Sequence, residues 1–158
     1  MPEIQDDPTV GADAILWRRI FPGWIEWGDG TAPRPISVAF IDRHTKKVSV
    51  SVGDETTVFK MLRCYPSHSI AAIQASVVRA SGYPIVRERT QYDPAHAFFP
   101  CPTGGKAREF SKAATWVILR RPALLRDRLA ILFLSVSRAI TVFFGWKCPP
   151  RQARTPEA

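Results

Sequence analysis

Two residues in the stretch RPISVAF, residues 34–40, could bind an anion together. Arg34 stands between two prolines, whose rings restrict the backbone and would aim its planar, permanently charged guanidinium at a carboxylate or a phosphate. Ser37 could add a hydroxyl to the same anion. Arg34 could equally pair with an acid such as Asp29 or Asp42 while Ser37 faces solvent, because surface arginines are common. The sequence leaves both interpretations open.

His96, in the stretch DPAHA, is the residue best suited to proton transfer. Its imidazole titrates near neutral pH, and the flanking alanines leave space around the ring. Asp93, three residues earlier, could orient that ring. Asp-Pro is also a common turn opener, after which a histidine can be a structural hydrogen-bond donor. We predict His96 and Ser37 as catalytic candidates, with Arg34 and Asp93 as ligand-binding residues.

Another ligand-binding candidate comes from two consecutive arginines in the stretch AILWRRI, residues 14–20. This stretch is rich in strand-forming residues, so Arg18 and Arg19 should point to opposite faces of a strand. At most one of them can then face a pocket shared with Arg34. We take Arg19 as that residue.

A zinc site is an alternative use of some of these side chains. Three residues separate Cys64 from His68, and four separate His96 from Cys101, so two thiolates and two imidazoles could complete a tetrahedral site. The stretches CYPSH and HAFFPC lack the tight spacing of strong zinc motifs. We predict no metal ligands, and the zinc alternative stays open. The chain has no P-loop, G-x-S-x-G or H-E-x-x-H motif.

The elements that must position these residues indicate an α+β domain with a curved, mainly antiparallel sheet. Residues 36–42 and 47–52 are the clearest strands, and in the second one valines alternate with serines. Residues 69–82 fit both a helix and a strand, and we expect a strand that runs into a short turn. Further short strands are expected at 84–88, 96–99 and 115–119, and helices at 55–63, capped by Asp54, and at 106–114.

Charge and composition divide the chain into three parts. Residues 1–13 are polar and are expected to form a flexible N-terminus. Residues 14–119 form the core domain, and residues 1–119 are nearly neutral, with 14 Lys and Arg against 12 Asp and Glu. Residues 120–158 are a basic extension, with eight Lys and Arg against two Asp and Glu. Within it, residues 124–146 are expected to form an amphipathic C-terminal helix that packs on the core, on a partner or on a membrane surface.

The stretches LWRRI, RPISVAF, VSVSV, DPAHA and WVIL occur in the order seen in a family of small, uncharacterised bacterial and phage proteins. The resemblance covers residues 14–119, and it departs from the family at PIS, where two serines are more usual. A weaker resemblance links the chain to ADP-ribosyltransferase-like domains, including RES-type toxins. That resemblance implies NAD as a possible cofactor, an arginine on its pyrophosphate, a supporting serine and a ribose-positioning Glu55. The glycine-rich stretch of RES domains is missing.

These observations lead to two hypotheses about function. The first is a small bacterial or phage effector of toxin or defence type. Its pocket for an anionic, nucleotide-like ligand would be lined by Arg19, Arg34, Ser37 and His96. The alternative is a non-enzymatic module that binds a protein or a nucleic acid. Whether the protein is an enzyme stays open. The acidic start of the chain has no apolar signal region, so we expect a cytoplasmic location, with membrane association through residues 124–146 as a further possibility.

Overall fold

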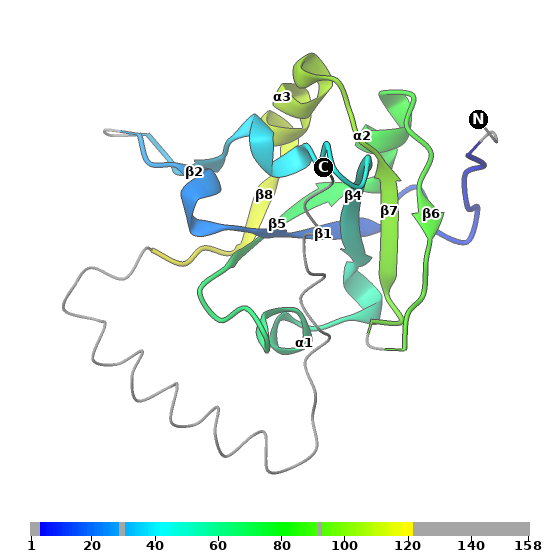
Figure 1. The fold of residues 1–158 in the computed structure, drawn as a ribbon, viewed down its shortest axis with the longest axis horizontal. Coiled ribbons are helices and arrows are strands. Elements are labelled where there is room, and N and C mark those ends of the chain that lie inside the picture. The colour runs from blue at the N-terminus through cyan, green and yellow to red at the C-terminus, as the bar shows by residue number, and fades with distance from the viewer. Residues whose placement is uncertain (1–3, 29–30, 92, 122–158) are drawn as a thin grey trace, which may run out of the picture. The chain divides into compact units, whose positions relative to one another are not determined.

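A six-stranded antiparallel sheet forms the centre of the computed structural model (Figure 1), which describes residues 4–28, 31–91 and 93–121. Side by side, its strands are β6 (Val86–Arg87), β7 (His96–Pro100), β4 (Lys47–Val52), β1 (Ile15–Ile20), β5 (Ser69–Gln74) and β8 (Thr115–Ile118). A second, two-stranded sheet pairs β2 (Ile25–Glu26) with β3 (Arg34–Pro35). The predicted α+β class and antiparallel sheet are confirmed.

Three helices and three 3-10 turns join these strands. The helices are α1 (Val58–Leu62), α2 (Ala75–Ala80) and α3 (Gly104–Ala113); the turns are η1 (Pro22–Trp24), η2 (Ser37–Phe40) and η3 (Gly53–Glu55). Thr57 caps α1 by accepting from the backbone N–H of Lys60, so the cap is three residues later than the predicted Asp54. None of the helices in the described part of the chain has the length and apolar character needed to cross a bilayer.

The face of the sheet that packs against α3 is lined mainly by buried apolar side chains. Alternation along β4 places its three valines on this face, and Phe99 and Phe110 meet there with ring centroids 5.6 Å apart. Phe110 lies on α3 and is completely buried. The turn η2 completes this layer by contributing Phe40, whose ring centroid is 6.3 Å from that of Phe110. This layer is the main hydrophobic core.

The opposite face carries a smaller apolar cluster and a polar region. Met61 and Leu62 of α1 pack against Ile70 of β5 and against the half-buried Trp17 of β1. Toward β7 the same face presents the serines of β4. The predicted strand at 47–52 is therefore confirmed with its valines buried, although one of its two serines is buried as well.

Residues 36–42 do not form the strand that their composition predicted. Residues Ser37–Phe40 make the 3-10 turn η2, and the backbone N–H of Ile41 donates to the carbonyl of Val38. The side chain of Arg18 occupies the place beside this segment, donating to the carbonyl of Ala39 at 3.0 Å and to that of Ser49 at 2.7 Å. A guanidinium thus supplies the donors that a neighbouring strand would have supplied.

Residues 69–82 satisfied two periodicities because they contain two elements, the strand β5 and then the helix α2. The N-terminal residues from 4 to 13, expected to be flexible, lie against the domain instead. Asp6 binds Arg79 with both carboxylate oxygens, at 2.9 and 3.1 Å, and Val10 is 1% exposed. The described residues end at Arg121, so the predicted helix 124–146 lies outside them.

Candidate functional site

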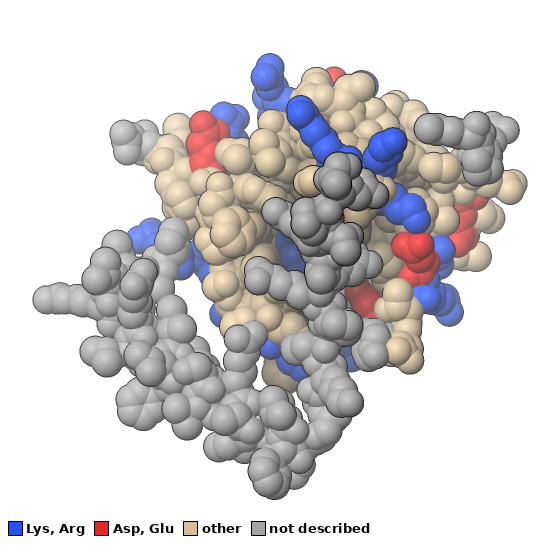
Figure 2. Space-filling view, in the orientation of Figure 1, with Lys and Arg blue, Asp and Glu red and all other residues tan. Residues whose placement is uncertain are grey.

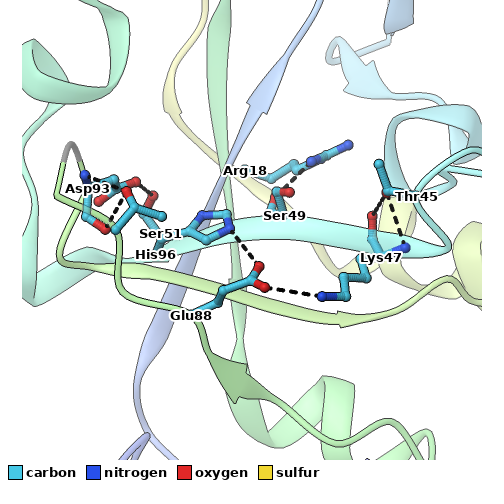
Figure 3. Close-up of polar contacts among 9 residues, drawn as sticks. Arg18, Thr45, Lys47, Ser49, Ser51, Glu88, Asp93 and His96 are labelled. Carbon is cyan, nitrogen blue, oxygen red and sulfur yellow. Dashed lines mark hydrogen bonds and ion pairs between the residues drawn. The ribbon is translucent and has the colours of Figure 1, made fainter. Parts of the chain in front are cut away.

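His96 begins strand β7 and lies on the polar face of the sheet, opposite Ser51 of β4 (Figure 3). The hydroxyl of Ser51 donates to Asp93 Oδ2 at 2.8 Å, and the backbone N–H of Ala95 donates to Asp93 Oδ1 at 3.1 Å. The backbone N–H of His96 donates to the carbonyl of Asp93 at 3.1 Å. Asp93 therefore orients His96 through the backbone turn, while its carboxylate is held by Ser51 rather than by the imidazole.

Glu88 connects His96 to a lysine. Its Oε2 lies 3.7 Å from His96 Nε2, and its Oε1 lies 3.1 Å from Lys47 Nζ. The ammonium group of Lys47 also stands 4.0 Å from the centre of the Phe98 ring. Figure 3 shows the imidazole turned toward Glu88, with Ser51 and Asp93 on its other side. The imidazole is thus bracketed by two carboxylates.

The environment keeps His96 neutral near pH 7. Burial lowers its pKa below the ordinary value of a histidine, and the positive charges of Arg19 and Lys47 lower it further, against the opposing effect of Asp93 and Glu88. The side chain is still 20% exposed, so a ligand can reach it. A neutral, reachable imidazole can accept a proton or a hydrogen bond.

Arg19 lies on the same face as His96. It pairs in the ladder with Ile70, on the side of β1 that carries Trp17, whereas Arg18 turns toward the core; the predicted opposition of the two arginines is confirmed. Burial lowers the pKa of Arg18 to about 10, which still leaves it charged at neutral pH. The guanidinium of Arg19 stands 4.2 Å from the centre of the Tyr65 ring, and within the described residues it forms no ion pair with a carboxylate. Arg19 is therefore a cation available to an anionic ligand.

Arg34 and Ser37 are not part of this cluster. Arg34 is on β3, where its Nε binds Glu26 Oε2 at 2.6 Å, so it pairs with an acid that the sequence analysis did not name. Figure 1 shows this small sheet beyond β8, away from β7. Ser37 starts η2, in the layer that covers the α3 face. The predicted pocket shared by Arg34, Ser37 and His96 is not assembled.

The alternative sites are also absent from the described parts of the chain. No three His, Cys, Asp or Glu side chains there are placed to hold a metal ion, so the zinc set of Cys64, His68, His96 and Cys101 is not assembled. Glu55, which the transferase resemblance would place on a ribose, binds Arg87 at 2.6 Å. This hydrogen bond lowers the pKa of Glu55.

Two hollows in the surface lie away from His96. One of about 780 Å³ lies between the N-terminal residues and the segment Gly82–Pro84, with Asp6 and Arg79 in its wall. The other, of about 310 Å³, lies beside Glu55 and Arg87. Neither is lined by Arg19 or His96, so neither belongs to the candidate site.

Sequence reasoning named Arg19, Asp93 and His96, which the structure places on one face of the sheet, but it did not name their neighbours Ser51, Lys47 and Glu88. The alternation of VSVSV already placed the serines on one polar face, and this was the available signal for Ser51. No local pattern marks Glu88, because it meets His96 only through the pairing of the β6 segment with β7.

Comparison with known proteins identifies no relative of this chain. No family model, no curated protein and no solved structure matches this chain. The resemblances drawn from its short motifs stay predictions. Its function must therefore be argued from the residues on the sheet face.

Proposed function

We propose that this protein binds a small anionic, nucleotide-like ligand on the face of the sheet that carries Arg19 and His96. The phosphate groups of the ligand bind Arg19, and His96 lies beside these phosphates. The observation that carries the proposal is the position of Arg19, a guanidinium aligned over Tyr65 and not neutralised by a carboxylate within the described residues. Arginine recognises phosphate through planar, charge-assisted hydrogen bonds. By contrast Arg34, Arg79 and Arg87 are each paired with an acid.

His96 gives this ligand site its possible chemistry. A neutral imidazole between Glu88 and Ser51 can accept a proton from a bound hydroxyl or water, and the neighbouring carboxylate of Glu88 would stabilise the imidazolium that forms. On this proposal His96 acts as acid and base, and Asp93 positions it through the 93–96 turn. The toxin or defence role of the ligand site rests on the motif resemblance alone.

A second candidate function is ligand binding without chemistry. The observation that favours it is the hydroxyl of Ser51, which donates to Asp93 and not to His96. An activated serine nucleophile needs its hydroxyl on the base. Ser37, the serine predicted for that role, belongs to the opposite layer.

Calorimetric titration of the full chain with inorganic pyrophosphate tests the binding site. Arg19→Gln should weaken pyrophosphate binding about tenfold or more, since a hydrogen bond to a charged group contributes about 1.5–3 kcal/mol. Arg108→Gln is the matched control, because Arg108 is an exposed arginine on α3, over the other face. Equal affinity in the wild type and in Arg19→Gln would contradict the proposal.

Two variants separate the two functions. His96→Ala should abolish nucleotide turnover or growth inhibition if His96 performs chemistry, and it should alter pyrophosphate affinity only slightly. If His96→Ala retains every such activity while Arg19→Gln loses the ligand, the non-enzymatic function is the correct one.

A further inference from the structure

Four aromatic rings line up beside Arg19 at the end of β1. The ring centroids of Trp24 and Phe21 are 6.0 Å apart, those of Phe21 and His68 are 5.7 Å apart, and those of His68 and Tyr65 are 5.2 Å apart. Each pair meets edge to face, an arrangement that aromatic rings favour. The row ends at Tyr65, where Arg19 stands over the ring. A charged group and a fixed set of rings are thus direct neighbours.

Phe21 is the exposed member of this row. It is 49% exposed, and it follows Arg19 by two residues in extended backbone, which places both side chains on the same side of the chain. Gly23 permits this position, because a Cβ there would lie 3.1 Å from Cε1 of the Phe21 ring. The η1 turn therefore packs against the Phe21 ring, and about half of the side chain remains exposed to solvent.

His68 serves the row as an aromatic ring rather than as a hydrogen-bonding group. Its Nδ1 is buried and has no hydrogen-bond partner within the described residues. Burial, and then the charge of Arg19, lower the pKa of His68, so the ring is neutral at pH 7. This neutral ring contacts both Phe21 and Tyr65 edge to face and so connects them.

We propose that this row is a base-stacking subsite, in which the base of a nucleotide stacks on Phe21 while its phosphates bind Arg19. The inference rests on the proposed anion site and names the class of ligand that the site takes. Exposed aromatic rings stack on the π-face of any base, and such stacking tolerates different bases. The short chain distance from Phe21 to Arg19 suits one nucleoside with its phosphates attached.

The charges of this face favour a free nucleotide over a nucleic-acid strand. Glu88 and Asp93 lie on the same face as Arg19 and would repel a continuous phosphate backbone. Both basic and acidic side chains are visible in Figure 2 on the surface outside the residues drawn in grey. Residues 1–119 carry 14 Lys and Arg against 12 Asp and Glu, which is far from the excess of a nucleic-acid-binding domain.

Calorimetric titrations of the full chain with pyrophosphate and with adenosine diphosphate test the subsite. We expect the wild type to bind the nucleotide about tenfold more tightly than pyrophosphate, the margin that stacking one base supplies. Phe21→Leu should remove that margin and leave pyrophosphate affinity unchanged, and Phe21→Trp should restore it. The matched control is Phe59→Leu, which changes a 69% exposed phenylalanine of α1 and should alter neither affinity.

Each other result has a distinct meaning. Pyrophosphate binding without any gain for the nucleotide, or an equal loss of both ligands in Phe21→Leu, overturns the stacking subsite and leaves the anion site standing. Failure of both ligands to bind the wild type overturns the anion site itself. A titration with an eight-residue oligouridine RNA completes the set. If the RNA binds more tightly than the nucleotide, with an affinity that falls steeply with salt, the ligand is a nucleic acid and the proposal is wrong.

Discussion

The two faces of the six-stranded sheet are made by alternate residues of the same strands, but they differ in what covers them. The face under α3 is closed by aromatic and β-branched side chains, of which Phe40, Phe99 and Phe110 are completely buried. The other face is covered by α1 only near Trp17 and Ile70. The rest of that face carries the polar groups around His96.

This contrast separates stability from function within one sheet. The α3 face removes a continuous apolar surface from water, which is the main source of folding free energy. Polar residues on the other face, such as Ser51, Glu88 and Lys47, bury little apolar area and are not needed for that purpose. We therefore expect substitutions on the α3 face to lower the free energy of unfolding. Substitutions on the other face should weaken ligand binding and leave stability nearly unchanged.

The largest expected effect is on the α3 face. Phe110→Ala should lower the free energy of unfolding by about 3–5 kcal/mol, because it leaves a cavity among well-packed rings. Phe110 is 0% exposed and contacts the rings of Phe40, Tyr83 and Phe99. Chemical denaturation measures the loss. Phe59→Ala, at a 69% exposed position on α1, should change stability by less than about 0.5 kcal/mol. Equal effects of the two substitutions would abolish the contrast.

Two glycines give the next largest effect, with opposite signs. A Cβ on Gly53 would lie 2.7 Å from Trp17 Nε1 and 3.0 Å from the carbonyl oxygen of Ile15. Gly53→Ala should therefore lower the free energy of unfolding by about 1–3 kcal/mol. Gly105→Ala should raise it by about 0.5–1 kcal/mol, because alanine favours the helix. Nothing lies within 4 Å of a Cβ at Gly105. Thermal unfolding of both variants checks the signs.

The consecutive arginines of β1 sharpen the comparison further. Arg18→Met should lower the free energy of unfolding by about 2 kcal/mol, because the carbonyls of Ala39 and Ser49 lose a charged donor. Arg19→Met should change stability by less than about 0.5 kcal/mol and should weaken pyrophosphate binding instead. The two measurements are denaturant unfolding and calorimetric titration. A destabilised Arg19→Met would make Arg19 a structural residue.

The smallest expected effect is a pH dependence with two separate ranges. Burial lowers the pKa of both His68 and His96, so the unfolded chain binds their protons more readily, and stability should fall as the pH drops through about 6.5. Replacing His68 by Phe and His96 by Gln should remove this decrease in the free energy of unfolding. Hydrogen bonds from Thr9 lower the pKa of Asp7, so its contribution persists down to about pH 4 and is lost below it. Unfolding free energies measured from pH 7.5 to 3.5 separate the two ranges.

The sequence predicted those parts of the fold that follow from local periodicity. The alternation in VSVSV located strand β4 and its polar face, and the same reasoning placed Arg18 and Arg19 on opposite faces of β1. Residues 36–42 misled this reasoning, because their apolar side chains pack against α3 from a 3-10 turn. A tertiary contact, the side chain of Arg18, satisfies the carbonyl of Ala39 there, and no local pattern encodes it.

The candidate site was predictable only where its members are close in the chain. Asp93 and His96 share one turn, so their spacing revealed them. Arg34 and Ser37 are equally close in sequence, but the chain turns between them and places them beside α3. The partners Glu88 and Lys47 come from different strands and meet His96 only when the sheet forms. Spacing alone therefore could not tell which residues the folded sheet brings onto one face.

The central position of β1 has a consequence for folding order. Leu16 pairs with Val52 on one side and with Ile73 on the other, so β1 lies between two strands that leave the ribosome after it. Such non-local pairing slows folding, because the chain loses entropy when the long loops close and the contacts between the strands offset this loss only afterwards. Until α3 is complete, nascent chains expose the apolar side of β1, Leu16 and Ile20, which pack in one cluster with Phe110. A ribosome that stalls before Ala113, the last residue of α3, would therefore hold a chain suited to chaperone binding or aggregation.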